Sequence, residues 1–206
     1  MSDETLRRLE RRWRETGAVE DEAALLAALL RAGELSRSAL EVAVHLGHEA
    51  ATSVVGLGVS PASELADPQL RAEGLLRWGQ AVCVRFCIAC AERALSERRA
   101  LGQELPSEAL LAVRVANDWL ACPCEEHALI AGTLAHVDQY NGEYVALRNY
   151  FWAREAPIAA AKMSIAHRAA RLALTLSADE IGIAPSGLFA RVAPEVARWA
   201  LDRGHL

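Results

Sequence analysis

The chain has 206 residues, enough for one substantial hydrophobic core. Apolar residues make up 52% of it and charged residues 24%, a composition that excludes an intrinsically disordered chain. The net charge of −5 argues against nucleic-acid binding, because contact with phosphate backbones needs a concentrated basic surface.

Targeting signals and thiol content favour a cytoplasmic protein. No apolar run approaches the roughly 18 to 20 residues that a membrane-spanning helix needs. The acidic start, residues 1–4, lacks the basic and apolar blocks of a signal peptide. Five cysteines are an odd number for a disulfide framework, so we expect reduced thiols, a cytoplasmic location and no membrane partner.

Helical periodicity runs from end to end. Apolar residues recur three and four apart, and no alternating strand pattern appears between turn residues. The sequence therefore predicts an all-α fold, an antiparallel helical bundle or a short α-solenoid of about eight to ten helices.

Glycine and capping residues mark the expected helix boundaries in the N-terminal third of the chain. A stripe of Leu6, Leu9 and Trp13 ends at Gly17, and a second helix over residues 20–32 pairs with the first as an antiparallel hairpin. Further on, Ser38 and Glu41 form a capping-box pattern that opens a third helix, and a short one covers residues 48–55. Residues 56–63 are rich in turn formers. We expect a single domain, 1–206, whose subdomains, if it has two, are an N-terminal one at 1–58 and a main bundle at 64–206.

The remaining helices follow from proline and capping signals. Asp67 followed by Pro68 starts a helical pattern that reaches about residue 99. Two glycines inside it predict either a break or a close helix contact near Trp78. Ser107 is the expected cap of the next helix. The later helices are expected over about residues 124–140, 157–176 and 194–203.

The break between two helical patterns at residues 118–127 is the best candidate for a chemical site. Cys122, Cys124 and His127 offer thiolate and imidazole ligands, which zinc prefers, and a cysteine from an upstream helix would complete a tetrahedron. The upstream group, Cys83, Cys87 and Cys90, lies on one helical face, where cysteine commonly acts as a small buried hydrophobe.

Other readings of the cluster compete with zinc. Its spacing differs from the common C-x₂₋₄-C knuckles, so buried or incidental thiols remain the default and no cofactor is expected. Cys124 at a helix N-terminus would also suit a thiolate nucleophile, although Glu125 and Glu126 oppose that charge. No oxyanion-hole glycine motif accompanies it, so we expect a protein that is not an enzyme.

Aromatic residues concentrate between residues 140 and 152. At helical spacing, these aromatic side chains either pack in the hydrophobic core or form a surface of the kind that supplies binding hot spots at protein interfaces. If they form a surface, Tyr144, Arg148 and Trp152 are the candidate partner-binding residues.

One stretch resembles a known class of proteins. The stretch from Trp78 to Trp119 resembles all-helical immunity proteins of bacterial polymorphic-toxin systems. The similarity lies in Trp78, in Cys87 and residues 90–95 on one expected helix, and in residues 106–109 leading to Trp119 on the next. The resemblance covers about a third of the chain and implies a stoichiometric inhibitor that occludes a toxin. We therefore expect a non-enzymatic helical protein-binding module with a protein partner; the alternative is a helical protein that binds a metal or small molecule through its cysteine clusters.

Overall fold

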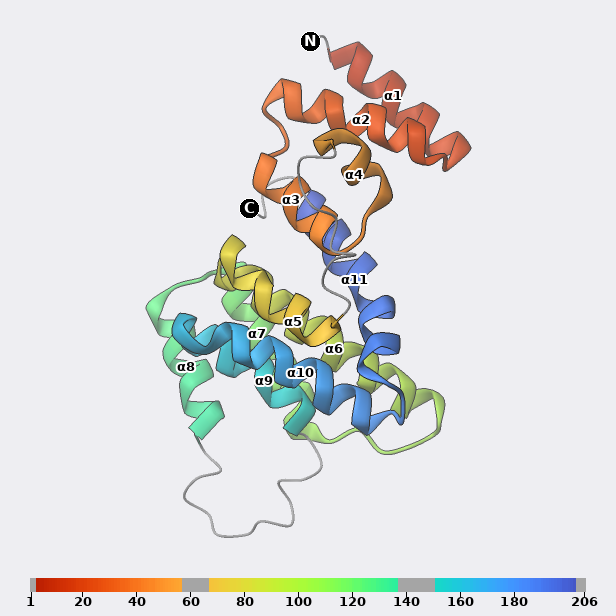
Figure 1. Cartoon of the computed structure of the whole chain (residues 1–206). Coiled ribbons are helices and arrows are strands. Elements are labelled where there is room, and N and C mark those ends of the chain that lie inside the picture. Colours follow the sequence, from red (N-terminus) through yellow and green to blue (C-terminus); the bar gives the residue numbers. More distant parts are fainter. Residues whose placement is uncertain (1–2, 57–66, 137–150, 203–206) are drawn as a thin grey trace. The chain divides into compact units, whose positions relative to one another are not determined.

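The computed structural model describes residues 3–56, 67–136 and 151–202, and every regular element in these ranges is helical. The all-α prediction is confirmed (Figure 1). None of the described helices is long and apolar enough to cross a membrane.

The chain forms two compact units that do not follow chain order. Unit 1 comprises residues 1–66 and 193–206, and unit 2 comprises residues 67–192. The sequence predicted subdomains at 1–58 and 64–206, whereas here residues 193–206 group with residues 1–66.

The described residues of unit 1 form four complete helices and the end of a fifth. These are α1 (Asp3–Thr16), α2 (Val19–Ala32), α3 (Arg37–His45), α4 (Glu49–Val55) and the later residues of α11 (Pro185–Leu201). As predicted, α1 and α2 pack against each other across a tight turn at Gly17, whose φ of +62° suits glycine. The carboxylate of Asp21 holds this turn, because it accepts from the Thr16 hydroxyl at 2.7 Å and pairs with Arg12 at 2.8 Å.

The start of α3 corrects one prediction. The N-cap is Ser36 rather than Ser38: its hydroxyl oxygen accepts from the backbone N–H of Ala39 at 3.0 Å. The reason lies in burial, since Leu35 and Leu40 occupy the flanking positions of a hydrophobic staple around Ser36, and both are buried.

Unit 2 contains the remaining elements. These are α5 (Pro68–Glu73), the 3₁₀ helix η2 (Gly74–Trp78), α6 (Gln80–Ala100), α7 (Ser107–Ala121), α8 (Glu125–His136), α9 (Phe151–Ala161), the 3₁₀ helix η5 (Met163–Ile165), α10 (Ala166–Glu180) and the start of α11. Helix α6 is the centre of the unit, because it packs against α7, α9 and α10 and buries residues on most of its faces.

Small residues let three of these helices approach closely. Helices α9 and α10 lie side by side (Figure 1) and bury mainly alanines. Gln80, the first residue of α6, links α6 to α9, because its side-chain amide donates to the backbone carbonyls of Ala159 and Ala160 at 2.7 and 2.8 Å.

The break expected near Trp78 is confirmed. Asp67 caps α5 by accepting from the Gln69 N–H at 2.8 Å, with Pro68 at the first helical position. The chain then passes through η2 to Gly79, whose φ of +108° is open only to glycine at low cost, before α6 begins.

Three other helix starts differ from expectation. Ser107 does not cap α7; it is the first helical residue, and its hydroxyl donates to the Glu108 carboxylate at 3.0 Å. The helix expected over 157–176 is divided, because α9 and α10 pack on each other and the chain must reverse at residues 162–165. Pro194 lies inside α11 instead of opening it, and Pro185 is the residue that starts the helix.

Candidate functional site

The connection between α7 and α8 is a tight, extended turn. Helix α7 ends at Ala121, and Cys122 adopts φ −143° and ψ 88°, the extended geometry expected before Pro123. The backbone N–H of Cys124 donates back to the Cys122 carbonyl at 2.8 Å, and the Cys124 carbonyl accepts the first bond of α8, from Ala128 at 3.1 Å. Cys124 is therefore the residue that opens α8.

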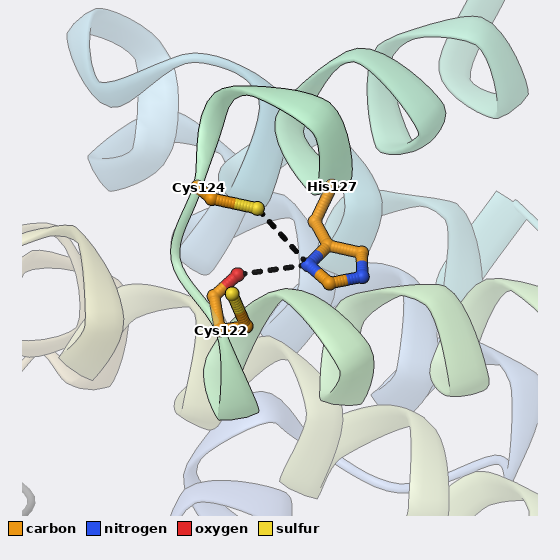
Figure 2. A group of neighbouring side chains, drawn as sticks. All are labelled: Cys122, Cys124 and His127. Atoms are coloured by element: carbon orange, nitrogen blue, oxygen red, sulfur yellow. Dashed lines mark hydrogen bonds between the residues drawn. The ribbon is translucent and has the colours of Figure 1, made fainter.

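This turn brings the predicted cluster together. The ligand atoms of Cys122, Cys124 and His127 all lie within 4.8 Å of one another. Figure 2 shows the three side chains converging, with His127 Nδ1 3.3 Å from Cys124 Sγ and 2.9 Å from the Cys122 carbonyl oxygen. Because a carbonyl oxygen can only accept, the proton of this imidazole is on Nδ1, and it is shared between the carbonyl and the sulfur.

Hydrogen bonds make the two thiols unequal. The pKa of Cys124 is lowered, first by the hydrogen bond from the backbone N–H of His127 and then by that from the Cys122 thiol. The pKa of Cys122 is raised, first because its thiol is the donor in that bond. The pKa of His127 is raised by its bond to the Cys122 carbonyl. Cys124 is therefore the more acidic of the two thiols.

The cluster is open to solvent. Cys122 is exposed, and Cys124 and His127 are half-buried. Among the residues that the structure describes, these three form the one group of three or more side chains close enough to hold a metal ion.

The upstream cysteines do not join this group. Cys83, Cys87 and Cys90 are fully buried in α6, in keeping with their expected role as small core residues. Burial raises the pKa of Cys83 to about 12 and that of Cys87 well above its ordinary value. The expected fourth ligand from this helix is therefore not supplied, because these thiols are buried and none of them belongs to the group at the α7–α8 turn.

The candidate partner-binding residues fall mostly outside the structure. Tyr144 and Arg148 lie outside the described ranges. Trp152 belongs to α9, but its side chain is not among those described.

A different exposed apolar surface lies on α8. Leu129 is 71% exposed and Ile130 46% exposed, and Glu125 and Glu126 are exposed one turn earlier on the same helix. We call Leu129 and Ile130 the α8 apolar pair. The pair was not predicted from the sequence, although its spacing of three and four residues from Glu126 indicates that charged and apolar residues share one helix face.

Unit 1 contains a groove that no local pattern indicated. It has a volume of about 480 Å³ and is lined by residues that include Trp13, Leu25, His48 and Arg198. The imidazole Nδ1 of His48 accepts from the Ala51 N–H at 3.3 Å, and burial lowers the pKa of this histidine. The groove combines carboxylates with an arginine, so its chemistry does not select one class of ligand.

Comparison of the chain with protein families, with curated proteins and with solved structures gives no match.

Proposed function

We propose that this chain is a non-enzymatic, cytoplasmic helical module that binds another protein through α8. The observation that carries the proposal is the α8 apolar pair. Exposed apolar side chains that share a helix face with carboxylates fit a partner whose surface has an apolar patch flanked by basic residues. The net charge of −5 supports the same choice of partner, since it would speed encounter with a basic protein.

The energetics of the pair are sufficient for a hot spot. Full burial of a leucine side chain contributes about 1.5–3 kcal/mol, so covering the 71% of Leu129 that is exposed would contribute about 1–2 kcal/mol. That range corresponds to a change in affinity of about five- to thirtyfold. Ile130, which is 46% exposed, would add a smaller contribution beside it.

The resemblance to immunity proteins supports a more specific form of this proposal. The partner is then a bacterial toxin, which the chain occludes by stoichiometric binding without turning over a substrate. The stretch that carries the resemblance runs through α6 and α7, the two helices that immediately precede α8.

Affinity purification followed by reconstitution tests the proposal. The tagged full chain should recover a basic protein in stoichiometric amount, and the purified partner should bind it again in isolation. Leu129→Ser should weaken this binding about five- to thirtyfold. Leu101→Ser is a matched control, because Leu101 is 72% exposed but lies after α6, and its substitution should leave the affinity unchanged.

The outcomes separate the parts of the proposal. A purified partner that binds the Leu129→Ser variant as tightly as the wild type would exclude α8 as the binding surface. Recovery of no stoichiometric partner would contradict the protein-binding function itself. The toxin form requires in addition that the partner arrests growth when produced alone and that co-production of this chain restores growth.

A further inference from the structure

We propose that Cys122, Cys124 and His127 form a zinc site with three protein ligands and one open position. The inference rests on the geometry of the α7–α8 turn and not on the protein-binding proposal. Zinc is the metal that this donor set favours, because two thiolates and one imidazole are soft to borderline ligands.

The distances require only a small movement. In a tetrahedral zinc site, bonds of about 2.3 Å to sulfur and 2.0–2.1 Å to nitrogen place the ligand atoms roughly 3.4–3.8 Å apart. The three ligand atoms here already lie within 4.8 Å of one another, and the Cys124 sulfur is 3.3 Å from His127 Nδ1. Small side-chain rotations that move the ligand atoms by about 1 Å or less would therefore close the site.

The imidazole presents the correct nitrogen. His127 Nδ1 faces both sulfurs in Figure 2, so a metal ion bound among them would replace the proton on that nitrogen. The Cys122 carbonyl would then lose its bond from Nδ1, but it would keep the bond from the Cys124 N–H at 2.8 Å. The Cys122 carbonyl therefore keeps a hydrogen-bond partner when the metal binds.

Local charge also favours a cation. Two adjacent thiolates repel each other, and a divalent ion between them removes that repulsion. The carboxylate of Glu126 acts electrostatically on both Cys122 and His127, so it adds a further negative charge near the ion. The positive end of α8, from which both Cys124 and His127 come, opposes the cation, but it also favours the negative charge of the Cys124 thiolate that would bind it.

The exposure of Cys122 defines the fourth position. The described residues supply three ligands, and the site is open to solvent, so the fourth position is accessible to water or to a ligand from outside the described residues. A site of this kind exchanges its fourth ligand more readily than a closed structural site with four protein ligands.

Cobalt(II) titration of the reduced, metal-free full chain tests the inference, because cobalt reports thiolate ligation through its ultraviolet charge-transfer absorption. We expect one cobalt ion per chain, a charge-transfer band and displacement of the cobalt by zinc. The variants Cys122→Ser, Cys124→Ser and His127→Asn should each weaken binding by at least about tenfold. Circular dichroism of each variant verifies that the helices remain folded.

Two control variants keep the test specific. Cys83→Ala removes a buried thiol of α6, and His167→Asn removes an imidazole of α10, so neither should change cobalt affinity. The zinc site is excluded if cobalt binds without a charge-transfer band, or if the double variant Cys122→Ser/Cys124→Ser binds as tightly as the wild type. Absence of any binding at tens of micromolar cobalt, where sites of this donor set are occupied, would exclude it equally.

Discussion

Gln80 connects the start of α6 to the end of α9, and its removal should measurably destabilise unit 2. Its amide donates to the Ala159 and Ala160 carbonyls at 2.7 and 2.8 Å, and both carbonyls belong to the last turn of α9, where helical partners run out. Each such hydrogen bond contributes about 0.5–1.5 kcal/mol, so Gln80→Ala should lower the free energy of unfolding by about 1–3 kcal/mol. For a chain of this size, that loss lowers the Tm by about 2–4 °C per kcal/mol.

The isosteric variant Gln80→Glu gives the sharper test. Near neutral pH its carboxylate cannot donate and faces two carbonyl oxygens, so it should destabilise the fold at least as much as alanine does. Proximity of those oxygens raises the pKa of the introduced carboxyl group in the folded state. Stability relative to wild type is therefore regained as the pH falls toward about 4.5, because the protonated acid donates again.

Urea unfolding followed by far-ultraviolet circular dichroism, at neutral pH and near pH 4.5, measures both effects. Gln69→Ala is the matched control, since Gln69 makes a single side-chain bond, to the Thr175 hydroxyl at 3.1 Å, and should lose no more than about half as much. The reasoning is refuted if Gln80→Ala unfolds at the wild-type urea concentration, or if the stability deficit of Gln80→Glu does not shrink on acidification.

Thiol labelling and a glycine substitution test two other features. In the metal-free native chain, two of the five thiols should react rapidly with a thiol reagent and the three α6 cysteines only after unfolding. The pKa of Cys124 is lowered and that of Cys122 is raised, so Cys124 should reach its maximal labelling rate at a lower pH than Cys122. Labelling rates of the two cysteines, measured by mass spectrometry, that show the same pH dependence would contradict this. Gly79→Ala should cost about 1–3 kcal/mol in thermal or urea unfolding, because φ of +108° strains any other residue. Gly187→Ala should be neutral, since a Cβ there meets only Ile183 at an ordinary 3.9 Å.

Local patterns predicted most of the helices because local physics determines them. Three examples are the turn at Gly17, the Asp67 cap and the break before α6. Each depends on the backbone or capping preferences of one or two residues, and the type of those residues can be read from the sequence. The cluster at the α7–α8 turn was predictable for the same reason, since its three members lie within six residues of one another.

Features decided by distant contacts were not predictable in this way. The choice of Ser36 over Ser38 depends on which leucines enter the core, and both serines fit a capping pattern. Likewise, Pro194 marks a helix start in isolation, yet it lies inside α11, whose two ends belong to different units. The groove near His48 needs Arg198, which is far away in the sequence.

The division of α11 between the units has a consequence for the order in which the chain can fold during translation. Residues 1–66 leave the ribosome before unit 2, but the groove beside Trp13 and Leu25 is completed by Arg198 and Leu201, which are synthesised more than a hundred residues later. The helices made first must therefore wait, with part of their apolar surface uncovered, while all of unit 2 is made. A premature stop codon anywhere before residue 193 would thus damage the unit that contains the N-terminus, even though its own codons precede the mutation.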